Sequence, residues 1–332
     1  MHIGITLSSC FLLLNLPGDR EHLDLLEMNK TSVTEFILTG LSDNTKLKIP
    51  LFVIFLHVYI TTVVGNIGFM SLNIIDKRLH KPMYLFLSNL SFVDFTCSST
   101  VLPKMLKDLL SETKAISFAG CAMQFFFFGS FGSTESLLLG VMAYDRYVAI
   151  CSPLLYQVHM SSVLCLQMLI AAYFGGFVNS LVHTVAAFHL NFCRSNIIDH
   201  FFCDLPPLYK LSCSDTSMNF VALIILGSLV SVSSIILICV SYTNIVRAVL
   251  KIQSAQGRYK AFNTCSSHIT AVSVFYVTVF FMYFRPSSSI LDQDWVASVF
   301  YSIGIPMLNP LIYSFRNAEV IEVLKSSWKC FK

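Results

Sequence analysis

The sequence predicts an all-α membrane protein, a bundle of seven transmembrane helices that ends in a short C-terminal amphipathic helix. Two features of the composition carry this prediction, because 55% of the 332 residues are hydrophobic and only 12% are charged. A soluble domain usually carries about 25% charged residues, so this chain has too few charges to cover a water-facing surface of its size. The third feature is the arrangement of the apolar residues, which gather in seven separate runs.

Each run is long enough to span a bilayer, which takes about 20 mainly apolar residues in a helix. The connections are short, apart from a long one after the fourth run at residues 186–217. The chain therefore divides into an extracellular N-terminal segment (1–48), a transmembrane domain (49–315) and a cytoplasmic tail (316–332). The seven predicted spans are Ile49–Ile75, Met83–Leu106, Ala119–Ile150, Ser162–Val185, Met218–Leu250, Arg258–Tyr283 and Trp295–Phe315.

The orientation follows from lysine and arginine, which favour the cytoplasmic side of a membrane. With the N-terminus outside, the inner segments carry 12 of these residues and the three outer loops carry 6. A glycosylation sequon at Asn29 lies in the N-terminal segment, where a glycan belongs if that segment is extracellular. We therefore expect a multi-pass protein of the plasma membrane with its N-terminus outside.

The first 27 residues contain an apolar stretch that resembles the core of a signal peptide. No lysine or arginine precedes this stretch, and no clear small-residue cleavage site follows it. We interpret residues 1–27 as an upstream extension, with Met28 as the more usual start.

The tail contains a second kind of helical pattern, at Asn317–Lys329. Its apolar residues fall at helical spacing and lysines lie beside them, which favours a helix on the inner membrane surface over a frayed tail. The apolar positions are Val320, Ile321, Leu324 and Trp328.

Two acidic residues, Asp94 and Glu135, lie inside the second and third spans. A charge inside the membrane is costly, so each intramembrane acid is a functional candidate. The two acids can remain protonated in a polar helix contact, pair through polar neighbours, or share a small cation such as sodium. The amide oxygens of Asn66 and Asn309 are available as further ligands for such an ion.

The third span carries a stripe of residues on one helical face, from Cys121 through Gly132, Glu135 and Leu139 to Arg146. Arg146 belongs to the sequence Asp145-Arg146-Tyr147 at the inner end of this helix. We expect Asp145 to hold Arg146 as an ion pair whose release frees the guanidinium group, which makes a plausible two-state element. The alternative is an arginine that only extends its charge to the membrane surface.

Four cysteines, Cys121, Cys193, Cys203 and Cys213, lie on the outer side, where disulfides are expected. Four cysteines allow three pairings, and their positions in the sequence do not select one.

The outer halves of the third and sixth helices contain the candidate ligand pocket. Helical spacing places the selected residues on turns that can face each other and line a mostly apolar cavity with a few hydroxyl groups. Such a lining suits a small uncharged molecule, although the same residues can also simply pack the two helices together. The candidates are Phe128, Gly132 and Ser133 in the third helix and Tyr276, Val279, Phe280 and Tyr283 in the sixth.

Three classes of function are less well supported by the sequence. An ion channel or transporter could use Asp94 and Glu135 as ion ligands, but no inverted repeat or paired broken helices appear in the sequence. A membrane enzyme is disfavoured because the sequence has no metal-ligand motif or nucleophile elbow. The net charge of +3 gives no nucleic-acid footprint.

Several motifs in order resemble the rhodopsin-like G-protein-coupled receptors, and within them the odorant receptors. The resemblance covers the chain from about Asn29 to its C-terminus. The family usually has Thr where Lys81 stands and Ser where Asn263 stands, so these two positions depart from its pattern. The matching motifs are Thr34–Leu38, Gly65-Asn66, Pro82-Met83-Tyr84, Met142–Cys151, Ser241-Tyr242, Lys260–His268 and Pro306–Tyr313.

The resemblance implies a receptor for small volatile odorants that activates a heterotrimeric G protein of the olfactory stimulatory type and raises cyclic AMP. It implies disulfides Cys121–Cys203 and Cys193–Cys213, a ligand pocket in the outer half of the bundle, and no cofactor other than a possible sodium ion. Membrane lipid is the other expected partner, and a rhodopsin-like receptor for another small non-amine ligand is the nearest alternative. The expected coupling residues are Asp145, Arg146, Tyr147, Tyr242, Asn309, Pro310 and Tyr313.

Overall fold

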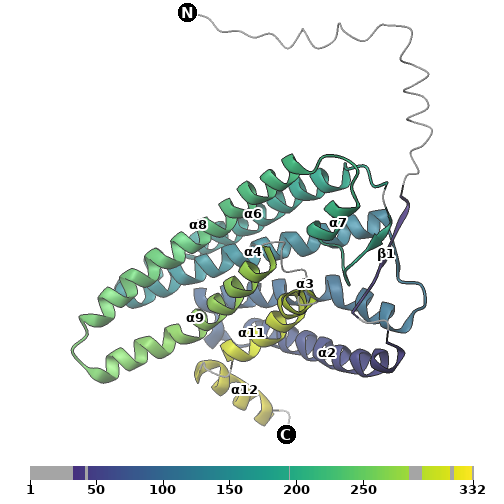
Figure 1. The fold of residues 1–332 in the computed structure, drawn as a ribbon. Helices are drawn as coiled ribbons and strands as arrows, with labels where there is room; N and C mark the ends of the chain where they lie inside the picture. The colour runs from purple at the N-terminus through teal and green to yellow at the C-terminus, as the bar shows by residue number, and fades with distance from the viewer. Residues whose placement is uncertain (1–32, 42–43, 194, 284–293, 315–317, 331–332) are drawn as a thin grey trace, which may run out of the picture.

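The computed structural model describes residues 33–41, 44–193, 195–283, 294–314 and 318–330, and its architecture is a helical bundle (Figure 1). Seven helices of the described part are long and apolar enough to cross a membrane, as the sequence predicted. The first six are α2 (Thr45–Ile75), α3 (Pro82–Leu110), α4 (Phe118–Cys151), α6 (Ser162–Phe188), α8 (Ser217–Leu250) and α9 (Ala255–Tyr283). The predicted glycosylation site Asn29 and the segment 1–27 lie outside the described residues.

Several helices begin at a polar side chain that satisfies a backbone N–H group of the first turn. Asn44, Ser117 and Ser161 accept bonds from the N–H groups of Lys46, Gly120 and Leu164. Helix α3 instead begins with Pro82, whose fixed backbone angle and missing N–H suit the first helical position. These starts, together with longer C-terminal ends, make most helices a few residues longer than the apolar runs.

The seventh span departs from the prediction of one continuous helix. It consists of α10 (Asp294–Val299), the π-helical turn η3 (Phe300–Gly304) and α11 (Ile305–Ser314). Periodicity cannot detect such a turn, because the extra residue changes the hydrogen-bonding pattern and not the apolar character of the segment.

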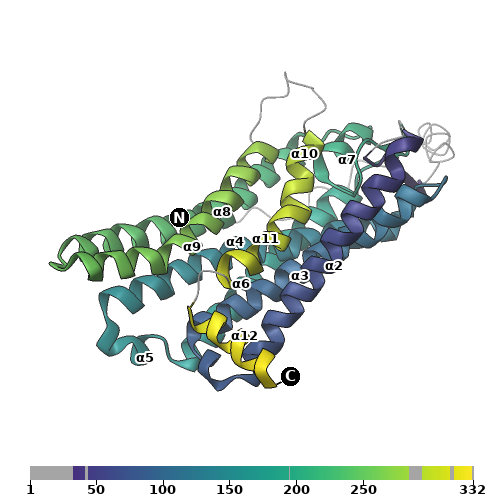
Figure 2. The same ribbon diagram turned by 90° about the horizontal axis from the view of Figure 1, so that it is seen from below.

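Helix α4 is the centre of the bundle and packs against α3, α6 and α8 (Figure 2). In the most apolar 18-residue stretch of α4, 67% of the residues are buried. The same share is 11% in α2 and 11% in α8. The apolar surfaces of α2 and α8 therefore remain available to lipid, because a membrane protein does not need to bury them against itself.

One end of the bundle, here named the cap end, carries a small sheet that the all-α prediction did not include. Strand β1 (Glu35–Leu38) pairs antiparallel with β2 (Ala115–Ser117) and parallel with β3 (Ile197–Ile198), in the order β2-β1-β3. Phe36 and Leu38 on β1 are fully buried among residues of α4, α6 and the short helix α7 (Leu205–Leu211). The cap end therefore joins the segment before α2 to two loops far away in the sequence.

The opposite end, here named the tail end, carries η1 (Lys77–Leu79), η2 (Pro153–Leu155), α5 (Tyr156–His159) and α12 (Ala318–Cys330). Figure 2 shows α5 and α12 together at this end and α7 at the other. The predicted tail helix is present as α12. Its residues Val320 and Val323 are fully buried, and Leu79 of η1 belongs to the same apolar cluster.

Candidate functional site

Two disulfides hold the cap end. Cys121 at the start of α4 is bonded to Cys203, with Cα atoms 5.6 Å apart, and Cys193 is bonded to Cys213, with Cα atoms 5.9 Å apart. Of the three pairings that the sequence left open, the structure has the one that the family resemblance implied. The long loop after α6 is thereby tied to α4 and closed upon itself.

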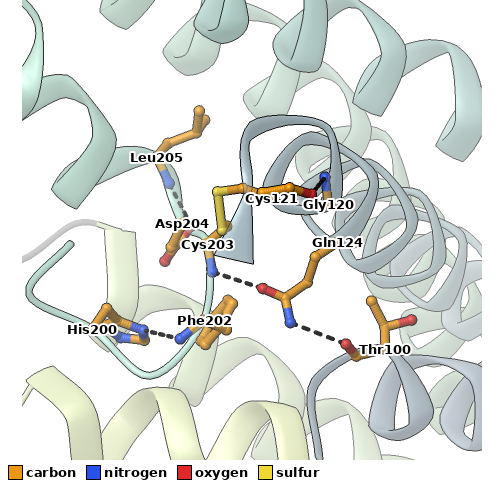
Figure 3. Close-up of a disulfide and its surroundings, with 10 residues drawn as sticks. Thr100, Gly120, Cys121, Gln124, His200, Phe202, Cys203, Asp204 and Leu205 are labelled. Atoms are coloured by element: carbon orange, nitrogen blue, oxygen red, sulfur yellow. Dashed lines mark hydrogen bonds between the residues drawn. A yellow bond between two sulfur atoms is a disulfide. The ribbon is translucent and has the colours of Figure 1, made fainter. Parts of the chain in front are cut away.

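Gln124 adds a second attachment for this loop, one turn beyond Cys121 (Figure 3). Its side-chain carbonyl accepts a bond of 3.0 Å from the N–H of Cys203, and its amide donates a bond of 3.1 Å to the carbonyl of Thr100 on α3. Because Gln124 is buried, these bonds replace water for two backbone groups. The residue links two helices to the loop, a role that the sequence analysis missed.

His200 and Asp204, which lie before and after Cys203 in the loop, have pKa values shifted by burial. Burial lowers the pKa of His200 to about 4, which keeps its ring neutral at neutral pH. Its Nδ1 can then accept a bond from the N–H of Phe202, while Nε2 lies 3.2 Å from the Ser298 hydroxyl on α10. Burial raises the pKa of Asp204 to about 6, although its carboxylate accepts a bond from the N–H of Leu205.

Below the loop, four aromatic rings from four segments meet, and they are here named the aromatic cluster: Phe128, Phe202, Phe275 and Tyr301. The Phe128 ring lies 4.9 Å from that of Phe202 and 5.6 Å from that of Tyr301. Phe275 of α9 lies 5.8 Å from Tyr301, also between ring centroids. The predicted pocket residue Phe128 thus contacts the rings of Phe202 and Tyr301, and Phe275 joins the cluster through Tyr301.

Gly132, the second predicted pocket residue, has no side chain and so leaves a space on the surface of α4. The structure fills that space with Tyr301, because a Cβ atom on Gly132 would lie 2.5 Å from the Tyr301 hydroxyl oxygen. Gly129, one turn earlier on α4, faces the Ser180 hydroxyl of α6. The two glycines therefore serve close helix contacts in this arrangement.

Tyr276, a predicted pocket residue in α9, lies next to the aromatic cluster, and its hydroxyl forms a hydrogen bond on the tail-end side of that cluster. Its hydroxyl is 3.0 Å from that of Ser136 on α4. The Ser234 hydroxyl of α8 donates to the carbonyl of the same Ser136. One buried group of hydroxyls therefore connects α4, α8 and α9.

The remaining predicted pocket residues do not share one face. Ser133 accepts a bond of 3.0 Å from Asn179 and so faces α6. Phe280 needs a correction, because it is 59% exposed and packs its ring on Phe281 at the outer surface of α9. Val279 is half-buried beside the aromatic cluster, and the side chain of Tyr283 lies outside the described residues.

The two intramembrane acids, Asp94 and Glu135, are both buried and share Asn309 as a neighbour. Asn309 donates its side-chain N–H to both oxygens of Asp94, at 3.2 and 3.1 Å, and it also lies beside Glu135. The nitrogen of Asn309, and not the predicted oxygen, therefore faces Asp94. The Asn66 side-chain oxygen and the Ser98 hydroxyl are also buried without a hydrogen-bond partner among the described residues.

Toward the tail end, Asp145 does not form the expected ion pair with Arg146. Its carboxylate accepts a bond of 2.6 Å from the hydroxyl of Tyr156 on α5, and no ion pair between Asp145 and Arg146 is present in the described part of the chain. The tyrosine lies eleven residues further along. The partner of Asp145 is therefore Tyr156, and not the adjacent Arg146 that the sequence suggested.

Arg146 is itself buried, and of the other predicted coupling residues Tyr242 and Tyr313 lie close enough to feel its charge. The hydroxyl of Tyr242 lies 2.8 Å from Nδ1 of His268, whose Nε2 lies 3.1 Å from the Leu139 carbonyl. Tyr313 is buried, Pro310 packs near Gly65, and Tyr147 is partly buried beside Tyr144. His268 is a connecting residue that the sequence analysis quoted only as part of a motif.

Helix α12 is fastened to the first tail-end loop by charged groups. Lys81 contacts both carboxylate oxygens of Glu319, at 2.7 and 2.8 Å, and Tyr84 donates to Glu319 at 2.8 Å. Arg78 bonds Asp76 and donates to Ser326 at 2.8 Å. Lys81, which departs from the family pattern, thus has a specific partner on α12.

Comparison with known proteins identifies the family. The sequence profile of the olfactory receptors matches residues 55–329. Olfactory receptor 5AP2 of Mus musculus is 54% identical over 298 residues, which is 90% of this chain and 94% of that receptor. Olfactory receptor 5AP2 of Homo sapiens is 52% identical over 303 residues, which is 91% of this chain and 96% of that receptor.

A solved structure supports the same fold. The crystal structure of squid rhodopsin matches with a TM-score of 0.67 at 20% identity, over 85% of this chain and 80% of that chain. The chain therefore belongs to the olfactory receptor family, whose members are seven-helix membrane receptors and not enzymes.

Proposed function

We propose that this olfactory receptor binds small, uncharged volatile molecules in the cap half of the bundle and activates a stimulatory G protein, raising cyclic AMP. The observation that carries the proposal is the position of two consecutive residues on α9. Phe275 belongs to the aromatic cluster, and the hydroxyl of Tyr276 bonds Ser136 of α4. A molecule that moves the cluster therefore acts on the contacts between α9 and α4, which continue to the tail end through His268.

The proposed orientation puts the N-terminus and the cap end outside the cell, in the plasma membrane. Two disulfides at the cap end suit an oxidising compartment. The excess of lysine and arginine on the opposite side suits the cytoplasm. Helix α12 then lies at the inner membrane surface, in contact with lipid headgroups.

The chemistry of the cap half suits a ligand that is mainly apolar. Aromatic rings supply contact area, and hydroxyl groups such as that of Tyr276 can fix the orientation of one polar group. Phe128 and its ring neighbours carry no charge, so a charged amine would find no carboxylate there.

The test is a cyclic AMP dose–response series with volatile compounds in cells that express the receptor. Tyr276→Phe and Ser136→Ala each remove one hydroxyl from the α4–α9 contact and should shift agonist potency or efficacy by about tenfold, or 1.4 kcal/mol. Tyr59→Phe is the matched control, since the Tyr59 hydroxyl bonds Ser99 and so joins α2 to α3, not α4 to α9. Dose–response curves equal to wild type for both variants, at equal surface level, would contradict the proposed signal path.

Arg146, with the tyrosines around it, is the proposed coupling element for the G protein. Arg146→Ala should reduce the cyclic AMP response without reducing surface expression or ligand binding. A normal response of that variant would show that Arg146 has no such role.

Asp94 and Glu135 are the proposed ligands of a sodium ion that favours the inactive arrangement. The unpartnered oxygens of Asn66 and Ser98 fit this assignment, because sodium prefers oxygen ligands. The alternative is that both acids are protonated. The double change Asp94→Asn with Glu135→Gln should abolish any sodium dependence of signalling, and a wild-type receptor without sodium dependence would remove the ion from the scheme.

A further inference from the structure

Tyr301 occupies the space that Gly132 leaves on α4. A Cβ atom at position 132 would lie 2.5 Å from the Tyr301 hydroxyl oxygen, closer than real Cβ atoms come to any atom. The next nearest atom of that ring, Cζ, would be 3.6 Å away, which is an ordinary contact. The hydroxyl group alone therefore excludes a larger residue at position 132.

The backbone that carries Tyr301 is the π-helical turn η3. A π turn accommodates one extra residue, so a return to regular α-helical geometry rotates the side chains on it. Such turns occur frequently at functional sites for this reason. Tyr301 thus stands on an element that can change its direction without unfolding.

Phe202, the other ring against Phe128, is held much more firmly. The neighbouring Cys203 is bonded to Cys121, and its N–H donates to Gln124 (Figure 3). The Phe202 ring is fully buried. Of the two rings that cover Phe128, Phe202 adjoins a covalent bond and a buried hydrogen bond at Cys203, whereas Tyr301 stands on the π-helical turn.

We propose that Tyr301 is a specificity-determining residue of the ligand site, and that the ligand takes the place of its ring beside Phe128 and against the fixed Phe202. This inference rests on the proposed function and narrows it. The space gained is that of one aromatic ring, so the receptor selects uncharged molecules of about that size with a single hydrogen-bonding group. The apolar part of the ligand contacts the rings of Phe128, Phe202 and Phe275.

The first experiment measures size selectivity with straight-chain and single-ring volatile alcohols and ketones of increasing length. Tyr301→Leu removes the ring, so the most potent members should become longer, with a change of about tenfold or more in the potency ratio of long to short members. Phe300→Ala is the matched control, because Phe300 is the adjacent aromatic residue on the same turn and is 41% exposed. It should leave the ratio unchanged.

The second experiment uses the contact at Gly132. Gly132→Ala forces the Tyr301 ring out of the place that the ligand takes, so the ligand no longer has to displace the ring and potency should rise, most for the largest members. Tyr301→Phe removes the oxygen that meets the new Cβ atom. The double variant Gly132→Ala with Tyr301→Phe should therefore regain the size selectivity of Tyr301→Phe alone.

The outcomes separate the inference from the proposed function. If no volatile compound activates the wild-type receptor at normal surface level, the proposed function and this inference fall together. If the receptor responds but all variants keep the wild-type order of potency by size, only the role of Tyr301 is overturned. If the double variant regains surface level and not selectivity, the contact serves packing alone, and the inference is again overturned.

Discussion

The two ends of the bundle are held by different kinds of interaction. At the cap end, two disulfides, the buried Gln124 and the aromatic cluster fix the loop over the helices. At the tail end, α12 is held partly by the ion pair of Lys81 and Glu319, whose side chains are 52% and 49% exposed. The pair of Arg78 and Glu322 is longer, at 3.8 Å, and the side chain of Glu322 is 77% exposed.

The difference indicates which end can rearrange. Exposed ion pairs are worth only about 0–1 kcal/mol each, whereas a disulfide contributes about 2–4 kcal/mol. A receptor needs two arrangements that differ by a few kcal/mol, so that a ligand can shift the balance between them. The firm cap end can hold the site in place while the weaker contacts of the tail end exchange.

The largest expected effect is the loss of the disulfide between α4 and the loop. The variants Cys121→Ser and Cys203→Ser should lower the free energy of unfolding by about 2–5 kcal/mol. The bond Cys193–Cys213 closes a loop of 20 residues, against 82 for the first, so its loss should cost less. Thermal unfolding of the purified receptor measures both, and equal costs would contradict the assignment of Cys121–Cys203 as the main attachment.

A smaller effect is expected from Gln124→Leu. This change leaves the N–H of Cys203 buried without its partner, which should cost about 1–3 kcal/mol. Gln157→Leu in α5 is the control, since Gln157 is exposed at the tail end and should change stability by less than about 0.5 kcal/mol. Equal melting temperatures for the two variants would show that Gln124 does not secure the loop.

The tail end can be tested through the bond between Tyr156 and Asp145. Tyr156→Phe removes one hydroxyl from the carboxylate, a change of about 1–2 kcal/mol. Because this bond supports the present arrangement of α4, its loss should raise basal cyclic AMP several-fold. Tyr59→Phe removes a hydroxyl bond from another region and should not. An unchanged basal level in Tyr156→Phe would mean that the bond does not bias the receptor.

The smallest effect is expected from Lys81→Thr, which restores the usual residue of the family. Half-exposed partners and screening by salt limit the loss of stability to less than about 1 kcal/mol. The difference from wild type should shrink at high salt, and Lys77→Thr serves as the control because Lys77 is an exposed neighbour. A loss that grows with salt would show that the role of Lys81 is not electrostatic.

The sequence by itself determined the features that depend on local composition. Runs of apolar residues of sufficient length must form helices in a membrane, because every backbone polar group needs a partner there. The positions of Asp94 and Glu135 inside spans, and the amphipathic pattern of α12, are local in the same sense. The motifs that occur in order along the chain also indicated the receptor family.

Only the tertiary structure decided which distant groups meet. The bond of Tyr276 to Ser136 joins residues 140 positions apart, and that of Lys81 to Glu319 joins residues 238 apart. The sheet at the cap end and the contact between Tyr301 and Gly132 depend in the same way on how the helices pack. Helical periodicity gives the face on which a residue lies, but it does not give the neighbour that the face meets. That choice is made by packing among all seven helices at once, which is why Ser133 and Phe280, predicted to share a cavity with Phe128, lie on separate faces.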